Sequence, residues 1–188
     1  MRDVMLDLET MGSSPKAAIV AIGAVAFDLQ GRLIGDTFYK VVDLASSMRL
    51  GGHVEASTIY WWLQQREEAR AELLTQGAMQ LPAVLTLLND FIELCTVGHE
   101  KVRVWGNGSD FDNVILGGAY DRVHLQRPWK FYNNRCYRTV KNLFQDVPMA
   151  PREEGAKHIA VSDALAQTHH LLAIAEKHPL SLMPSSRQ

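Results

Sequence analysis

The chain has 188 residues, of which 47% are hydrophobic and 21% charged, so it suits a globular protein with one sizeable core. No apolar stretch approaches the ~20 residues that cross a bilayer, and the N-terminus has no signal peptide, so we expect a cytoplasmic protein without a membrane segment. The net charge of −2 argues against a protein that coats nucleic acid broadly. Cys95 and Cys136 show no zinc spacing and are expected to be reduced thiols.

The predicted elements alternate between strands and helices without a strict repeat. Strands are expected at residues 3–8, 17–28, 33–42 and 102–105, and the short connections between the first three favour an antiparallel meander. Helices are expected at residues 57–71, 81–95, 111–122, 136–146 and 160–177. This order predicts an α/β fold, in which a mixed central sheet (the meander plus parallel strands) is flanked by helices. We expect one domain over residues 1–178 and a flexible polar tail over residues 179–188.

The first strand carries two acids, Asp7 and Glu9, in an otherwise apolar run. Side chains alternate along a strand, so Asp7 and Glu9 point to one face, and Leu6 and Leu8 point to the other. Two like charges on one face of a nearly buried strand need compensation, and a divalent cation with oxygen ligands is the simplest source. Two exposed acids on an edge strand are the alternative for these two residues taken alone.

Two further segments supply acids and a histidine. Residues 107–112 read Asn-Gly-Ser-Asp-Phe-Asp and follow the fourth strand, while His158 lies five residues before Asp163 at the start of the last helix. On one continuous helix this spacing would turn the two side chains ~140° apart. Both can therefore reach one site only if His158 lies on the preceding loop.

Three motifs in this order, DxET, Nx3FD and Hx4D, resemble the signature of the DEDDh 3′–5′ exonucleases, the DnaQ-like and RNase T-like group. The segments DLETMGSSPKAAI and WGNGSDFDNVIL, together with the pair Trp61-Trp62, resemble a phage and bacterial RNase T-like subgroup. The resemblance covers roughly residues 3–175. It implies a ribonuclease H-like fold and a 3′–5′ exonuclease that releases nucleoside 5′-monophosphates.

The resemblance also implies a set of catalytic groups. Two divalent cations, Mg²⁺ with Mn²⁺ as a substitute, would be bound by four carboxylates: Asp7, which bridges them, Glu9, Asp112 and Asp163. His158 is the candidate general base, because imidazole titrates near neutral pH and can take a proton from the attacking water. A surface histidine at a helix start is the alternative interpretation of His158.

Substrate contacts are expected from residues around these motifs. The resemblance places Thr10 near the terminal 3′-hydroxyl and Met11 against the last base. Adjacent helical positions diverge by ~100°, so one tryptophan of the pair is expected to pack inside and the other to offer a stacking face. Trp62 is the candidate for the substrate contact, although the sequence does not separate it from Trp61, and core packing of both is the alternative. Asn107 either binds substrate or holds its turn, and Arg138 is a candidate phosphate contact.

The expected partner is a nucleic-acid 3′ end, and the motifs do not distinguish DNA from RNA. A homodimer is also expected from the resemblance, since one subunit's basic surface would help the other's site. Residues 122–157 hold eight Lys or Arg and three Asp or Glu, the bases being Arg122, Arg127, Lys130, Arg135, Arg138, Lys141, Arg152 and Lys157. A catalytically silent module that grips a nucleic-acid end or a protein partner is the alternative from another functional class.

Overall fold

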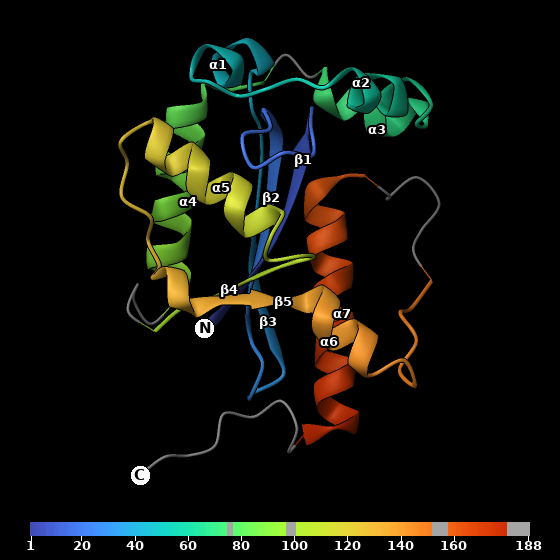
Figure 1. Ribbon diagram of the computed structural model, residues 1–188. Coiled ribbons are helices and arrows are strands. Elements are labelled where there is room, and N and C mark those ends of the chain that lie inside the picture. Colours follow the sequence, from blue (N-terminus) through green and yellow to red (C-terminus); the bar gives the residue numbers. More distant parts are fainter. Residues whose placement is uncertain (75–76, 97–100, 152–157, 180–188) are drawn as a thin grey trace.

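The computed structural model describes residues 1–74, 77–96, 101–151 and 158–179. Within these residues the strands form a five-stranded sheet in the order β3-β2-β1-β4-β5. Strands β1, β2 and β3 pair antiparallel, whereas β1 with β4 and β4 with β5 pair parallel. This mixed sheet with flanking helices confirms the predicted fold class (Figure 1).

The element bounds agree closely with the predicted strands and less closely with the predicted helices. The strands are β1 (Asp3–Thr10), β2 (Ile19–Asp28), β3 (Leu33–Val41), β4 (Arg103–Gly106) and β5 (Asn134–Cys136). The helices are α1 (Leu44–Arg49), α2 (Ala56–Leu63), α3 (Glu67–Leu73), α4 (Leu81–Cys95), α5 (Asp112–Arg122), the 3₁₀ helix η1 (Phe131–Asn133), α6 (Tyr137–Leu143) and α7 (Ala160–Lys177). No helix in the described part of the chain combines the length and apolar character that a bilayer crossing requires. Residues 180–188 of the expected tail lie outside the described residues, and the single-domain division stays a prediction.

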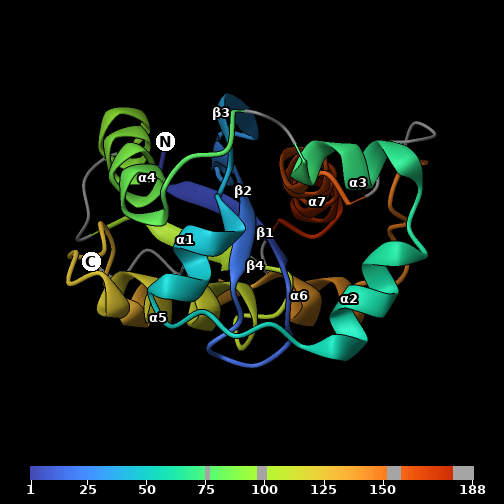
Figure 2. The same cartoon turned by 90° about the horizontal axis from the view of Figure 1, so that it is seen from above.

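Helices cover both faces of the sheet and divide the core into two layers (Figure 2). On one face, Leu6 and Leu8 of β1 pack in a cluster with buried side chains of α4 and α5. On the other face, Met5 packs with buried side chains of α6 and α7. Each large apolar side chain that is fully buried contributes about 1.5–3 kcal/mol. The alternation of β1 therefore places Asp7 and Glu9, which share the face of Met5, toward α7.

Gly23 of β2 lets α7 approach the sheet closely. Gly23 pairs with Asp7 in the β1–β2 register. A Cβ at Gly23 would lie 2.2 Å from the carbonyl carbon of Ala160 and 2.3 Å from the nitrogen of Val161, so no larger residue fits without moving the helix backbone. The glycine therefore lets the first turn of α7 lie against β2, next to the β1 residue Asp7 with which Gly23 pairs.

One predicted helix was wrong, and two short elements were missed. The helix expected at residues 57–71 is two helices, α2 and α3, and Ile59 and Leu63, which helical spacing would place on one face with Trp62, are 42% and 62% exposed. Helix α1 and strand β5 were not predicted. Strand β5 has three residues with no apolar alternation, and its pairing with β4 rather than its own sequence makes it a strand.

Candidate active site

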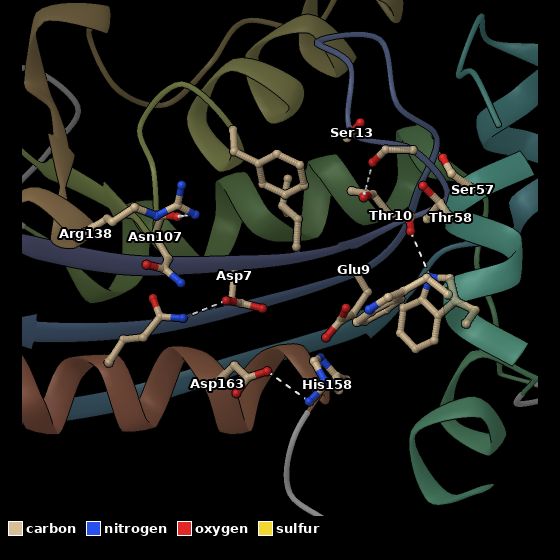
Figure 3. A pocket seen from close by; sticks show the side chains of 16 residues that line it. Asp7, Glu9, Thr10, Ser13, Ser57, Thr58, Asn107, Arg138, His158 and Asp163 are labelled. Carbon is tan, nitrogen blue, oxygen red and sulfur yellow. Dashed lines mark hydrogen bonds between the residues drawn. The ribbon is translucent and has the colours of Figure 1, made fainter. Parts of the chain in front are cut away.

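A cavity of about 700 Å³ opens beside the C-terminal end of β1 (Figure 3). Its size lies within the ~300–1,000 Å³ of small-ligand sites. Strand β1, the loop that follows it, helix α2, the turn after β4 and the start of α7 all contribute to the lining. The lining residues named by the sequence analysis are Asp7, Glu9, Thr10, Trp61, Trp62, Asn107, Arg138, His158 and Asp163.

Three of the four expected carboxylates, those of Asp7, Glu9 and Asp163, line this cavity, whereas Asp112 is not among the lining residues and is bonded to the β1 backbone beside it. Asp7 and Glu9 come from β1 and share the face of the sheet that α7 covers. Asp112 begins α5 and accepts a hydrogen bond from the backbone N–H of Leu8, which is 3.2 Å from its Oδ1. Asp163 lies in the first turn of α7. The fold therefore brings together acids from distant parts of the sequence: Asp7 and Asp163 are 156 positions apart.

Burial makes two of these carboxylates bind protons tightly. Burial, and secondly the charge of Asp112, raise the pKa of Glu9 from 4.5 to about 8. Burial also raises the pKa of Asp112, although backbone N–H groups, including that of Leu8, act in the opposite direction. Buried acids with raised pKa values are typical of functional sites.

A structural acid on the same strand looks different. Asp3 is fully buried, yet Arg103 donates to both of its oxygens at 2.8 and 2.6 Å, and Trp105 donates to one at 2.8 Å. Glu9 is 7% exposed, and its Oε1 has no hydrogen-bond partner among the described residues. A buried carboxylate oxygen without a donor costs free energy unless something else binds it. The contrast indicates that Glu9 is placed to bind a ligand rather than to hold the fold.

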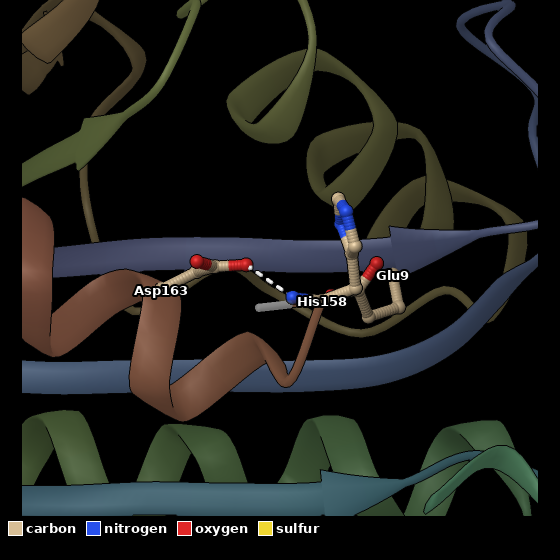
Figure 4. Close-up of side chains that lie close together, drawn as sticks. All are labelled: Glu9, His158 and Asp163. Carbon is tan, nitrogen blue, oxygen red and sulfur yellow. Dashed lines mark hydrogen bonds between the residues drawn. The ribbon is translucent and has the colours of Figure 1, made fainter. Parts of the chain in front are cut away.

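His158 lies on the segment before α7, as the spacing to Asp163 predicts. Its φ of 62° is in the left-handed region, which is uncommon for a residue other than glycine. The backbone N–H of His158 donates to Asp163 Oδ2 at 3.0 Å, and one ligand atom from each of Glu9, His158 and Asp163 lies within 4.8 Å of the others (Figure 4). The imidazole packs edge-on against Trp61, with ring centroids 4.8 Å apart.

The donor set fits hard divalent cations. All four acids offer oxygen, the donor that Mg²⁺ and Mn²⁺ prefer, and Glu9 Oε1 is a buried oxygen with no protein donor among the described residues. Asp7, Glu9, Asp112 and Asp163 could hold such ions. His158 lies close enough to Glu9 and Asp163 to be either a neighbour of the ions or a ligand.

The tryptophan pair divides as the helical geometry predicts. Trp62 is 5% exposed, and its Nε1 donates to the carbonyl oxygen of Thr10 at 3.0 Å. Trp61 is 40% exposed and also lines the cavity. The open aromatic face therefore belongs to Trp61, whereas Trp62 supports the cavity wall. Contact between Trp62 and substrate stays a prediction.

The loop after β1 is tied to α2 by hydrogen bonds. Ser13 Oγ donates to Glu55 Oε2 at 2.9 Å, and the backbone N–H of Glu55 donates to the Met11 carbonyl. Thr10 Oγ1 donates to the Gly12 carbonyl at 2.6 Å. Met11 is not among the residues that line the cavity, so its expected contact with the last base gains no support from this geometry.

Asn107 and Arg138 form the opposite wall. An Arg138 guanidinium nitrogen donates to the Asn107 carbonyl at 2.6 Å, and both residues line the cavity. Gly108, which follows Asn107, has φ +116°, and a Cβ there would lie 3.2 Å from the guanidinium carbon of Arg138. The glycine both allows this turn and makes room for the arginine.

Gln167 is a site residue that the sequence analysis missed. Gln167 lines the cavity, is 2% exposed, and donates from Nε2 to Asp7 Oδ1 at 2.7 Å. It follows Asp163 by four residues, so the two side chains share a face of α7. That spacing was the available signal, but no motif includes Gln167.

Comparisons with known proteins agree with this geometry. A family model described as the 3′–5′ exoribonuclease Rv2179c-like domain matches residues 2–175. An exodeoxyribonuclease of Enterobacteria phage T4 is 28% identical over an alignment of 180 residues, which covers 82% of this chain and 78% of the phage protein.

Solved structures show the same fold. The nuclease domain of 3′hExo, a DEDDh family member bound to rAMP, matches with a TM-score of 0.60 and 16% identity over 93% of this chain and 92% of that chain. The zinc-bound E. coli ExoI–ssDNA complex matches with a TM-score of 0.65 and 14% identity over 94% of this chain and 41% of the longer ExoI chain. The fold is that of the DEDDh exonucleases.

Proposed function

Because the chain belongs to the 3′–5′ exoribonuclease Rv2179c-like family and is a 3′–5′ exonuclease, we propose that it hydrolyses the last phosphodiester bond of a nucleic-acid strand with two divalent cations and releases nucleoside 5′-monophosphates. The observation that carries this proposal is the group of four carboxylates, in which Glu9 is buried without a protein donor among the described residues. Mg²⁺ is the proposed ion, and Mn²⁺ is expected to replace it.

The acids bind the ions in this proposal. Two cations, when bound, activate the attacking water and neutralise charge on the leaving oxygen. Asp7 lines the cavity together with Glu9 and Asp163 and is proposed to be shared by both ions. Glu9, Asp112 and Asp163 complete the two sets of ligands. The raised pKa values of Glu9 and Asp112 support this role, because they indicate that the protein alone does not stabilise the two negative charges. A nearby cation would favour the charged forms.

His158 is proposed to accept the proton of the attacking water at a ring nitrogen. Its backbone is fixed by Asp163 and its ring by Trp61, so the imidazole is held beside Glu9 at the cavity. Oxygen ligands suit Mg²⁺ better than imidazole does, which favours the base over the ligand role.

The 3′ end is proposed to lie between α2 and the Asn107 turn. Thr10 Oγ1 uses its hydrogen on the Gly12 carbonyl, so toward a substrate it can only accept, which suits a terminal hydroxyl as the donor. Arg138 is proposed to contact phosphate, and Asn107 to hydrogen-bond the strand. Trp61 offers the stacking face that any base can use.

Single-stranded ends of both DNA and RNA are the proposed substrates. The family model is described as an exoribonuclease and the phage relative as an exodeoxyribonuclease, so these descriptions support both RNA and DNA as proposed substrates. The solved neighbours include a complex with ssDNA and one concerned with the 3′ end of a histone mRNA stem-loop.

A cytoplasmic homodimer is also proposed. The nucleic-acid substrate supports the location. The basic segment 122–157 supports the dimer, because it would supply the basic surface that helps the other subunit's site. Within this segment, the side chains of Phe131 and Tyr132, next to Lys130, are 70% and 58% exposed. Arg152 and Lys157 of that segment lie outside the described residues.

The test is a degradation assay on 5′-labelled single- and double-stranded DNA and RNA of one sequence. Each strand is prepared with a free 3′-hydroxyl and with a blocked 3′ end, and each is incubated with Mg²⁺, Mn²⁺ or excess chelator. We expect a ladder of products that shorten from the free 3′ end only when metal is present. Activity that persists in chelator, or on blocked ends, would contradict the proposal.

A further inference from the structure

Gln167 is a buried amide that reaches the acidic group from the second turn of α7. It lies four residues after Asp163, and its side chain lines the same cavity. Its Nε2 is 2.7 Å from Asp7 Oδ1, which is a short hydrogen bond to a carboxylate. Helix α7 therefore offers two groups to the site: the Asp163 carboxylate and the Gln167 amide.

The partner of this hydrogen bond fixes the orientation of the amide. An ionised carboxylate only accepts, so the amide nitrogen must face Asp7 and the oxygen must point elsewhere. Gln167 Oε1 is shielded from solvent and has no hydrogen-bond partner among the described residues. Buried acceptors without donors are rare and each calls for an explanation. A water or a substrate hydroxyl in the filled cavity would supply the missing donor.

A neutral amide suits this position electrostatically. A Lys or Arg at position 167 would also hold Asp7, but it would neutralise the charge that a cation needs. A Glu would add a fifth carboxylate to the group. An amide donor fixes the rotamer of a carboxylate ligand and leaves its negative charge available, as hydrogen-bonded partners of metal ligands commonly do.

We propose that Gln167 is a positioning residue of the exonuclease site, whose amide nitrogen holds Asp7 in the rotamer that binds divalent cations and whose amide oxygen accepts a hydrogen bond from water or substrate. This inference rests on the proposed function and adds a residue that none of the three motifs contains. A purely structural role, in which Gln167 only packs α7 on the sheet, predicts a loss of stability without a change in ion binding.

The test compares Gln167→Met with wild type and with a matched control. Met keeps the length of the side chain and removes both polar atoms. The control is Thr168→Val on the next residue of α7, which is fully buried and loses a hydrogen bond to the Ala164 carbonyl, at 2.8 Å, away from the cavity. For each protein we would measure Mn²⁺ binding by calorimetry without nucleic acid, thermal denaturation, and kcat and KM on a single-stranded oligonucleotide.

We expect Gln167→Met to bind Mn²⁺ about 10–100-fold more weakly and to lose kcat by a similar factor, with little change in KM. Thr168→Val should keep wild-type Mn²⁺ affinity even if it melts at a lower temperature. If Gln167→Met does not fold, Gln167→Asn, which keeps the amide but is one methylene shorter, should show the same loss of Mn²⁺ affinity.

The outcomes separate this inference from the proposed function. If wild type binds Mn²⁺ and degrades the oligonucleotide, and the Gln167 variants bind Mn²⁺ equally well, the positioning role is overturned and the function stands. If wild type neither binds Mn²⁺ nor degrades nucleic acid, both are overturned.

Discussion

Glu9 binds a proton more tightly than an exposed glutamate because it is buried beside Asp112. A carboxyl whose pKa rises on folding stabilises the folded state while it is protonated, and this contribution is lost as the pH increases from the unfolded value to the folded one. For Glu9 that window runs from 4.5 to about 8. The metal-free protein should therefore become less stable across the neutral range.

The substitution Glu9→Gln removes this titration and keeps the shape of the side chain. Without metal, wild type should lose up to about 1.4 kcal/mol of stability per pH unit relative to Glu9→Gln through the window. Thermal melts in chelator over a pH series would show it, with Glu93→Gln on an exposed part of α4 as the control. With saturating Mn²⁺, wild type should instead be more stable than Glu9→Gln. If the stability of the two proteins changes in parallel with pH, the charge of Glu9 does not destabilise the folded state.

His158 separates base catalysis from metal ligation. As a base, its loss in His158→Ala should lower the rate by roughly 10²–10⁴. Mn²⁺ affinity should hardly change, and added imidazole should restore part of the rate. His169→Ala, an exposed histidine on α7, is the control that should behave as wild type. A variant that instead loses Mn²⁺ affinity, and regains activity only at high Mn²⁺, would make His158 a ligand, a role its place near Glu9 and Asp163 also permits.

At the scale of elements, the position of α7 depends on Gly23. Gly23→Ala would place a Cβ against the backbone of Ala160 and Val161, which cannot rotate away as a side chain could. We expect a loss of about 1–3 kcal/mol of stability. The activity should decrease by more than the loss of folded protein accounts for, because His158 and Asp163 move with the start of α7.

Assays below the melting temperature of the variant would separate the two effects. Gly77→Ala is the matched control, since a Cβ there meets no described atom within 4 Å. Full activity of Gly23→Ala at a temperature where it is folded would mean that the site tolerates displacement of the helix.

The sequence predicted those elements whose own residues carry a periodic signal. Strand β1 and helix α4 have clear alternation or helical spacing and were placed within a few residues. The break between α2 and α3 was missed, because Ile59 and Leu63 mimic an amphipathic face although both are exposed. Strand β5 forms because it pairs with β4, and the residues of β5 alone carry no signal for that pairing.

The site shows the same limit. Motif spacing selected acids that the fold brings to one region, and it placed His158 ahead of the helix. The sequence could not tell which of the two cavity-lining tryptophans stays exposed, since that depends on how α2 docks onto Thr10. It also missed Gln167, whose role arises only when α7 is laid against β1.

At the scale of the whole molecule, the proposed homodimer predicts a mass in solution of about 42 kDa, twice the 21.0 kDa of the chain. Light scattering coupled to size-exclusion chromatography would measure this mass. A monomer with full activity would contradict the proposed dimer.

Lys130→Glu, in the basic segment, should weaken activity more than it weakens Mn²⁺ binding, because Lys130 is expected to act on the nucleic-acid strand and not on the ions.

In the proposed reaction, water attacks the phosphorus of the last phosphodiester bond, and the four acids and their cations make this attack possible. A single-turnover reaction in water enriched in oxygen-18, with Mg²⁺ and a single-stranded oligonucleotide bearing a free 3′-hydroxyl, tests it most directly. Mass spectrometry should find a nucleoside 5′-monophosphate that carries one heavy oxygen, and a strand shortened by one residue with a 3′-hydroxyl. Asp112→Asn should give neither product. A nucleoside 3′-phosphate, an unlabelled monophosphate, or the same products in excess chelator would contradict the account.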